Sequence, residues 1–350
     1  MVNVPTDHRL KITATIYRRG QCPHKSQPKN DCDNFKCTHT NTYGLNAPNS
    51  KYFCPMQLLD GKLVAQSVKD TLKQKVSQLS LKGIKPPHLA AILIGSHGAS
   101  ETYVASKVKN CEEVGFKSTL IRLPASVDES VLISTLQQLN NDAAIDGILV
   151  QLPLPKQISE EKIISLIHPD KDVDGFHPMS VGKMVQGLPT FIPATPYGIM
   201  LMLEYYHIET KGKHAVVIGR SNIVGRPISI LLSRNTNPGN STVTICHSHT
   251  ANLKEICLQA DIVVAALGKP GFLTADMVKE NAVVIDVGIT RVADTSKKSG
   301  FTIKGDVDFE NVAPKCSFIT PVPGGVGLMT IAALLMNTYN ACIQKVTNSN

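Results

Sequence analysis

Short apolar runs that alternate with helical stretches extend through most of this 350-residue chain, and they restrict its fold more than any other feature. In the first half, the spacing of apolar residues predicts strands at 88–95, 118–123 and 147–154, and helices at 63–79, 99–115, 128–140 and 159–168. Apolar strands that are joined by helices form a parallel sheet built of βαβ units. The first half therefore predicts an α/β domain.

A second alternating block follows a segment rich in Pro and Gly, in which Thr195 and Pro196 predict the N-cap and first residue of a helix. Strands are predicted beyond it at 214–219, 241–247, 261–267 and 282–288, with a helix from about 224 and a final apolar helix at 326–346. We expect two α/β domains, the second a Rossmann-like doubly wound parallel sheet, with a catalytic cleft between them. The predicted parts are an N-terminal extension at 1–54, a catalytic domain at 55–195, a nucleotide-binding domain at 196–325, and a helix at 326–350 that packs back on the first domain.

Charge is distributed unevenly along the chain. The net charge is +8, but residues 1–54 hold eight Lys and Arg against three Asp and no Glu, which leaves +3 for the remainder. So small a surplus does not indicate nucleic-acid binding, although it suits a small polyanion such as a phosphorylated cofactor. No apolar run reaches the roughly 18 to 20 residues of a membrane span. We therefore expect neither a nucleic acid nor a membrane as partner.

The first 54 residues are treated as separate from the fold. The basic, acid-poor stretch "HRLKITATIYRRG" resembles an organellar transit peptide, while a disordered segment or a misassigned gene start remain alternatives. Cysteine and histidine side chains in this region have no spacing typical of a zinc module; they are Cys22, His24, Cys32, Cys37, His39 and Cys54.

The strand "HAVVIG" runs directly into the turn "GRSNIVGRP" at 219–227, and the following helix begins near Val224. Backbone N–H groups and the helix dipole at such a turn favour a pyrophosphate. The spacing is Gly219-x5-Gly225, with Ser221 and Val224 where the usual fingerprint has its second and third glycines. An ordinary strand-to-helix turn is the alternative, and the three further apolar strands favour cofactor binding.

The choice of cofactor is predicted from charge at the end of the next strand. NAD sites usually place a carboxylate there, whereas NADP needs cations and hydroxyls. No acid occurs between Ser241 and Thr250, so Arg220 and Ser248 are predicted to hold a 2'-phosphate. A surface ion pair is the alternative role of Arg220. NADP is the predicted cofactor, with NAD as the alternative.

Tyr103 and Lys107 are four residues apart in "TYVASK", the spacing of the acid/base pair of short-chain dehydrogenases. In that family the glycine turn precedes the pair, but here Gly219 follows Tyr103 by 116 residues. The order excludes that family. On a helix the two side chains share one face and can both point into a cleft, although a helix-surface pair without function is the alternative.

Eight motifs complete a resemblance to the methylenetetrahydrofolate dehydrogenase/cyclohydrolase family across residues 56–345. They occur in the family's order and spacing, as "SETYVASKVKNCEEVGF", "DGILVQLPLP", "PDKDVDGFHP", "ATPYG", "GRSNIVGRP", "DVGI", "GDVDF" and "TPVPGGVG". The resemblance implies that Lys107 is the catalytic lysine, Tyr103 stacks on the folate, Gln151 assists Lys107 and Asp174 binds the pterin edge. It further implies contacts at the substrate and nicotinamide cleft from Pro323, Gly324 and Gly325, and contacts with the nucleotide from Thr195, Gly219, Arg220, Ser221, Ile223, Gly225, Ser248 and Ile289.

The segment around Asp174 also imitates the start of a calcium loop, because Asp170, Asp172 and Asp174 alternate before Gly175. Position twelve of such a loop should be Glu and is Val181. No metal is therefore predicted.

The resemblance implies a bifunctional enzyme that oxidises 5,10-methylenetetrahydrofolate with NADP and hydrolyses the methenyl product to 10-formyltetrahydrofolate. A monofunctional dehydrogenase and a non-catalytic nucleotide- or folate-binding protein are the alternatives. The resemblance also implies a homodimer and, as substrates, tetrahydrofolate derivatives that can carry polyglutamate tails. Ala194 and Leu328 depart from the family's usual Cys and Pro. The N-terminal extension and the insert "SRNTNPGNS" favour a mitochondrial enzyme, otherwise a cytoplasmic one.

Overall fold

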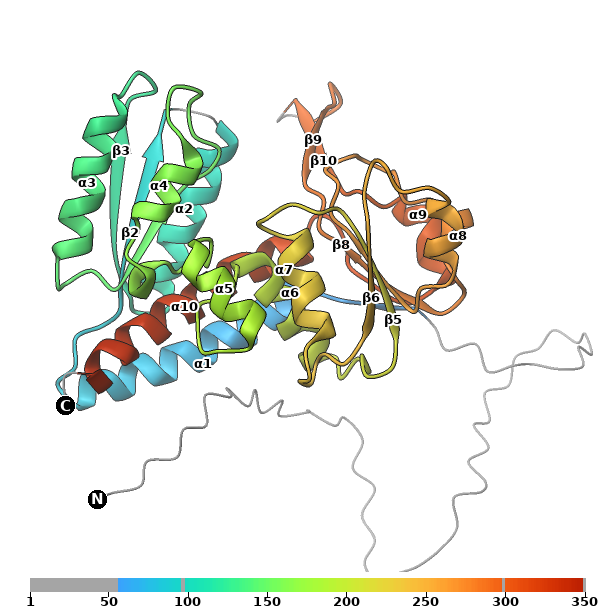
Figure 1. Cartoon of the computed structure of the whole chain (residues 1–350), viewed down its shortest axis with the longest axis horizontal. Coiled ribbons are helices and arrows are strands. Elements are labelled where there is room, and N and C mark those ends of the chain that lie inside the picture. Colours follow the sequence, from blue (N-terminus) through green and yellow to red (C-terminus); the bar gives the residue numbers. More distant parts are fainter. Residues whose placement is uncertain (1–55, 96–97, 298–299, 349–350) are drawn as a thin grey trace, which may run out of the picture. The chain divides into compact units, whose positions relative to one another are not determined.

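The computed structural model describes residues 56–95, 98–297 and 300–348 (Figure 1). Contacts between these residues gather the chain from Met56 onward into one unit. The predicted extension at 1–54, with its transit-peptide and zinc interpretations, lies outside the described residues.

A three-stranded parallel sheet of order β3-β2-β4 forms the first part of the fold. Its strands are β2 (His88–Ile94), β3 (Lys117–Leu123) and β4 (Gly147–Val150), and the helices between and after them are α2 (Gly98–Glu113), α3 (Glu129–Asn141) and α4 (Glu160–Leu166). Leu132 and Leu136 of α3 are fully buried in one cluster with Ile148 of β4. The predicted strands and helices of this half are confirmed.

A six-stranded parallel sheet of order β1-β11-β8-β7-β5-β6 forms the second part. Its strands are β1 (Gln57–Leu58), β5 (His214–Ile218), β6 (Thr242–Cys246), β7 (Ile262–Ala265), β8 (Ala282–Asp286) and β11 (Cys316–Ile319), and α7 (Gly225–Ser233), α8 (Leu253–Leu258) and α9 (Phe309–Val312) connect them. From β5 the chain winds to β6 on one side, and from there to β7 and β8 on the other. The sheet is therefore doubly wound, as predicted, with its switch point beside β5.

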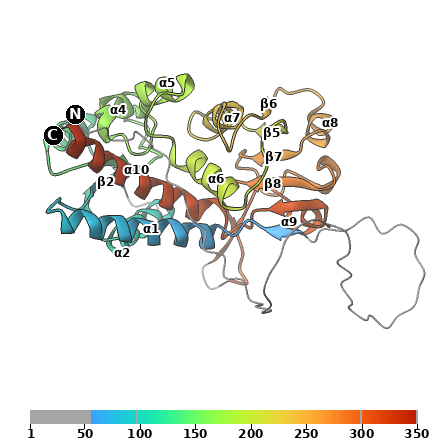
Figure 2. The same ribbon diagram turned by 90° about the horizontal axis from the view of Figure 1, so that it is seen from below.

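The further α-helices of the described fold are α1 (Gly61–Leu81), α5 (Pro178–Gln186), α6 (Ala194–Tyr205) and α10 (Val326–Asn348). Figure 2 shows α10 running alongside α1, and α10 contacts both α1 and α6 as well as β4 of the first sheet. Val326–Thr347 is long and apolar enough to cross a membrane by length and composition alone, but 67% of its apolar 18-residue window is buried inside the protein. It therefore resembles the core helix of a folded domain.

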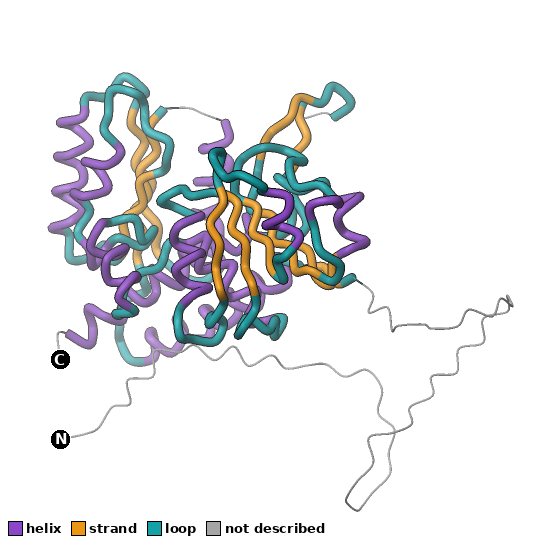
Figure 3. Tube along the Cα trace, turned by 45° about the vertical axis from the view of Figure 1, so that its right-hand side comes forward, coloured by secondary structure: helices purple, strands orange, loops and turns teal. Residues whose placement is uncertain are grey.

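Several features differ from the sequence prediction. Helix α6 begins at Ala194, with Pro193 at the N-cap, so the prediction of Thr195 as N-cap is wrong. The hydroxyl of Thr195 instead lies 3.0 Å from that of Thr330 in α10. The short strands β1 and β11, the helix α5 and an antiparallel pair were not predicted. That pair, β9 (Thr290–Ala293) and β10 (Phe301–Lys304), extends away from the six-stranded sheet (Figure 3).

Candidate functional site

A cavity of about 510 Å³, large enough for a ligand, lies in the described part of the chain. Its walls come from α2, the segment after β4, the β9–β10 pair and the segment that leads into α10. Six of the predicted site residues line it: Tyr103, Gln151, Ile289, Pro323, Gly324 and Gly325. The structure therefore brings together residues from distant parts of the sequence.

Lys107 lies beneath the wall of this cavity and is only 5% exposed. Its Nζ donates a hydrogen bond of 3.1 Å to Oε1 of Gln151 and lies 4.6 Å from the centre of the Tyr103 ring. Nε2 of Gln151 donates to the carbonyl of Leu152 at 2.8 Å. Because the nitrogen end of the amide is engaged by that carbonyl, its oxygen faces the lysine.

Burial changes the proton affinity of the groups around Lys107. Desolvation lowers the pKa of Lys107, although the charge of Asp174 opposes the shift. The pKa of Asp174 is raised to about 6, mainly by desolvation, with the charge of Lys107 acting against it. Desolvation also raises the pKa of Tyr103. A buried lysine of lowered pKa can serve as a neutral base.

The turn that contains Asp174 is organised by the nearby Asp172. The carboxylate of Asp172, which is 1% exposed, accepts hydrogen bonds from the N–H groups of Phe176 and His177 at 3.2 and 2.9 Å and from the Ser180 hydroxyl at 2.7 Å. Desolvation raises its pKa to about 6. These hydrogen bonds fix the backbone that carries Asp174. They also occupy the Asp172 carboxylate, which would have to bind the ion in a calcium loop.

Gly61 supports the far wall of the cavity. Its N–H donates to the carbonyl of Gly324 at 2.9 Å, and a Cβ added at Gly61 would lie 2.0 Å from the carbonyl oxygen of Gly325. The start of α1 therefore packs directly on the segment "PVPGG". Sequence reasoning missed Gly61, and the only available signal was a glycine after the N-cap residue Asp60.

The predicted nucleotide turn lies at the carboxyl end of β5. Gly219 adopts φ +130°, and a Cβ added at Gly225 would lie 2.2 Å from the carbonyl oxygen of Gly219, so the turn closes too tightly for a side chain there. The Ser221 hydroxyl accepts hydrogen bonds from the N–H groups of Val224 and Gly225 at 3.2 and 3.3 Å, which caps the start of α7.

Arg220 and Ser248 are both exposed beside this turn. His247 has a lowered pKa, caused by desolvation and by the charge of Arg220, which places Arg220 near the end of β6. No ion pair of Arg220 is found within the described ranges, so the alternative of a surface ion pair has no support there. Ile223 is also exposed, at 42%. Thr195 lies apart from this turn, in α6 against Thr330.

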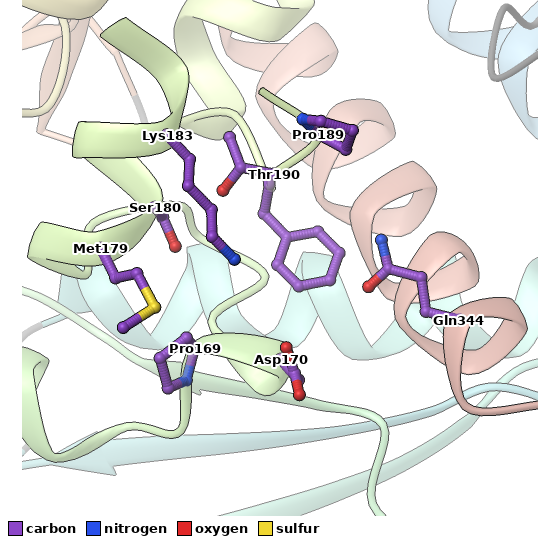
Figure 4. Close-up of a pocket in the computed structure, with 9 residues that line it drawn as sticks. Pro169, Asp170, Met179, Ser180, Lys183, Pro189, Thr190 and Gln344 are labelled. Carbon is purple, nitrogen blue, oxygen red and sulfur yellow. The ribbon is translucent and has the colours of Figure 1, made fainter. Parts of the chain in front are cut away.

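A second, much smaller pocket lies between α5 and α10 (Figure 4). Lys183, Ser180, Asp170 and Gln344 are among the residues that line it, and its volume is about 30 Å³. That space suits one or two water molecules. It contains none of the predicted site residues, so the larger cavity is the candidate active site.

A doubly wound sheet with a tight glycine turn, together with a buried lysine at a neighbouring cavity, defines a two-part nucleotide-dependent enzyme. Two family models match the chain: the catalytic domain of tetrahydrofolate dehydrogenase/cyclohydrolase over residues 59–174, and the NAD(P)-binding domain of the same enzymes over residues 193–346. The chain belongs to the tetrahydrofolate dehydrogenase/cyclohydrolase family.

Similar proteins agree with this assignment. The bifunctional protein FolD of Cytophaga hutchinsonii is 62% identical over 290 residues, which are 83% of this chain and 100% of the relative. The FolD protein of Flavobacterium johnsoniae is 60% identical over 286 residues, 82% of this chain and 97% of the relative. The solved FolD structure from Campylobacter jejuni is 48% identical, with a TM-score of 0.78, and covers 83% of this chain and 99% of its own. The Trypanosoma brucei dehydrogenase-cyclohydrolase, solved with NADP and an inhibitor, is 37% identical, with a TM-score of 0.79. The match covers 83% of this chain and 98% of the Trypanosoma chain.

The expectation of a mitochondrial enzyme is wrong. The two FolD relatives at 62% and 60% identity are bacterial proteins, and bacteria have no mitochondria. The extension at 1–54 lies outside the described residues and provides no support for that location.

Proposed function

We propose that the cavity oxidises 5,10-methylenetetrahydrofolate with NADP and then hydrolyses the methenyl product to 10-formyltetrahydrofolate. The observation that carries this proposal is the hydrogen bond between Lys107 and Gln151 beside the Tyr103 ring, at the wall of one cavity. The buried amine provides a base, and the ring provides a flat surface for a planar substrate. A binding protein without activity has no use for the base.

The oxidation depends mainly on positioning. The Tyr103 ring is suited to stack on the pterin, and the Asp174 carboxylate is suited to accept two hydrogen bonds from its amino group and ring N–H. NADP, when bound, accepts the hydride that leaves the methylene carbon. The residues at 323–325 line the cavity, where their backbone is suited to approach both ligands and to help hold the reacting carbons in contact.

The hydrolysis requires proton transfer. Water attacks the methenyl carbon, a C–O bond forms, and the neutral amine of Lys107 takes the proton that the water loses. The hydroxyl group of this adduct then loses its proton as the C=O bond forms, and the bond from the same carbon to N5 breaks as N5 takes a proton, which leaves the formyl group on N10. The Gln151 oxygen holds the lysine amine in the orientation that this transfer needs.

The preference for NADP over NAD follows from the region around Arg220. The Gly219–Gly225 turn leaves no room for a Cβ, so backbone can approach a pyrophosphate closely. The exposed guanidinium of Arg220 and the hydroxyl of Ser248 are suited to a 2'-phosphate. The Trypanosoma relative, solved with NADP, supports this choice by analogy.

The same proposal assigns the two ligands to different parts of the chain. Residues 55–195 with the helix at 326–350 bind the folate, and residues 196–325 bind the nucleotide. We further propose that the enzyme is a homodimer that accepts polyglutamylated folates, both on the ground of family membership. A mass measured by light scattering during gel filtration tests the dimer.

The decisive experiment follows the methenyl product of the purified chain by its absorbance. We expect its formation with methylenetetrahydrofolate and NADP, and its subsequent decay. Lys107→Met should slow the decay at least as severely as the formation, whereas Lys109→Met, on the exposed face of the same helix, should change neither. No nucleotide reduction with NADP or NAD would refute the enzyme, and a normal decay rate in Lys107→Met would refute the base.

A further inference from the structure

Two buried carboxylates lie next to each other at the carboxyl edge of the six-stranded sheet. Asp286 is the last residue of β8 and is 3% exposed, and Asp306, two residues after β10, is 0% exposed. The backbone N–H of Asp306 donates to Oδ1 of Asp286 at 2.8 Å. Desolvation and, to a smaller extent, the charge of Asp306 raise the pKa of Asp286. The fold therefore holds two acidic groups close together in its interior.

One oxygen of this pair has no partner. Oδ2 of Asp306 accepts hydrogen bonds from the N–H groups of Leu267 and Gly268 at 2.6 and 2.9 Å. Oδ1 of Asp306 is buried and has no hydrogen-bond partner among the described residues. A buried acceptor without a partner lowers stability, and a buried charge lowers it further. A carboxylate kept in such a place points to a use for its charge.

The unpartnered oxygen lies directly behind the wall of the large cavity. A Cβ added at Gly288 would lie 2.3 Å from Oδ1 of Asp306, so this oxygen packs on the backbone of Gly288. The N–H of Gly288 donates to Oδ1 of Asp286 at 3.0 Å. Asp286 and Ile289, which flank this part of the backbone, both line the cavity. The two carboxylates therefore stand behind one part of the wall, at 286–289.

Within the described ranges, neither carboxylate forms an ion pair. Arg291 is the one cation among the residues that line the cavity, but it is exposed, and its guanidinium carbon lies 4.4 Å from the centre of the Phe301 ring. Water and salt screen an exposed charge more than a buried one. The buried carboxylates therefore give the wall at 286–289 a negative potential.

We propose that Asp286 and Asp306 select the redox form of the nucleotide, because their charge strengthens the binding of NADP and not that of NADPH. This inference rests on the proposed function, since it assumes that the nicotinamide enters the cavity beside Ile289. The oxidised nicotinamide ring carries a positive charge, and the reduced ring carries none. The two forms are similar in size and outline, so a fixed negative charge nearby is a physical means of distinguishing them.

The charge can act without touching the ring. A tenfold change in affinity requires about 1.4 kcal/mol. At an effective dielectric constant of about 20, two unit charges attract each other by that amount at a separation of about 12 Å. Asp306 can therefore act through the backbone of Gly288. It is a residue that determines specificity and not a catalytic one.

Asp306→Asn is the most direct test, because it removes the charge and can keep the accepted hydrogen bonds. The amide oxygen can replace Oδ2 opposite Leu267 and Gly268, and the amide nitrogen then replaces Oδ1, which has no donor to lose. The Kd values of NADP and NADPH are measured by titration calorimetry at pH 8, where Asp286 is ionised. Asp306→Asn should raise the Kd of NADP about tenfold and change that of NADPH by less than about twofold.

Two further variants separate the effect of charge from that of folding. Asp286→Asn removes the neighbouring charge and should also weaken the binding of NADP more than that of NADPH, which provides the test if Asp306→Asn does not fold. Asp276→Asn removes an exposed carboxylate that does not line the cavity, and it should leave both Kd values unchanged. An unchanged Kd of NADPH shows that a variant keeps an intact nucleotide site.

The outcomes are distinguishable. An equal rise in the Kd of NADP and of NADPH would overturn the inference, because it would mean that the carboxylates only shape the site. An unchanged Kd of NADP in Asp306→Asn and Asp286→Asn would overturn it as well. Failure of the unmodified enzyme to bind either nucleotide would instead refute the proposed function itself.

Discussion

Asp286→Asn tests the carboxylate that joins the loops at the carboxyl edge of the large sheet. Its Oδ1 accepts from the N–H groups of Gly288 and Asp306 at 3.0 and 2.8 Å, and its Oδ2 accepts from that of Val307 at 3.0 Å. A Cβ added at Gly305 would lie 1.9 Å from Oδ2, so the loop closes tightly over the group. Asparagine keeps the shape and the oxygen but turns an N–H₂ group toward one backbone donor.

The size of the effect follows from the pKa of Asp286. Desolvation raises it to about 6, despite the three hydrogen bonds, compared with about 3.9 for an ordinary aspartate. The folded state therefore binds more protons than the unfolded state between these values, and its stability falls as pH rises through that window. Burying the ionised carboxylate of Asp286 lowers the free energy of unfolding. This loss is absent well below pH 4 and fully present above pH 6, where it amounts to about 3 kcal/mol.

The variant cannot titrate and therefore lacks this pH dependence. The free energy of unfolding, measured with urea, should show that Asp286→Asn destabilises the protein more at pH 4.5 than at pH 7, by about 2 kcal/mol. Asp276→Asn is the matched control, since this exposed carboxylate has its pKa lowered to about 2 by Lys254 and Thr274. The Asp276 carboxylate is largely ionised at pH 4.5 in both the folded and the unfolded protein. The change in unfolding free energy caused by Asp276→Asn should therefore be equal at the two pH values. Equal effects of Asp286→Asn at both pH values would refute the reasoning.

Three other changes test separate parts of the site. Arg220→Ala should raise the KM of NADP much more than that of NAD, and equal changes would remove its phosphate role. Gly61→Ala should displace the segment around Gly325 and raise the KM of the folate several-fold; an unchanged KM would mean that the loop adapts freely. Asp172→Ala leaves three donors without their acceptor and should lower stability by about 2 to 4 kcal/mol in urea unfolding. A loss below about 1 kcal/mol would contradict that role.

The buried strands were predictable because they are apolar on both faces. All five residues of β8 are buried, as are all four of β7 and all four of β4. Strands buried on both faces have consecutive apolar residues in the sequence, and such runs can be recognised. Strand β9 alternates between half-buried and exposed residues, and β1 has only two. Strands of two and four residues are too short for a period of two to stand out from chance.

The site was predictable only in part, for a related reason. Tyr103, Lys107 and Gln151 stand in motifs, and the structure places them in contact with one another. Gly61 belongs to no motif that indicated a site. Its place depends on packing between segments from opposite ends of the sequence, the start of α1 on the loop before α10. Local sequence contains no information about such neighbours.

The four-residue spacing of Tyr103 and Lys107 has a physical consequence that does not depend on any family. Neighbours at this spacing lie on one face of a helix, which brings the Lys107 amine to 4.6 Å from the Tyr103 ring. Burial favours the neutral amine, whereas the ring and the Gln151 oxygen favour the ammonium. A hydrolytic base needs both influences, because it must be neutral before the water attacks and must then hold the proton that it receives. If the ring stabilises that ammonium, Tyr103→Leu should lower the pH at which hydrolysis becomes independent of pH, because the lysine loses its proton more readily.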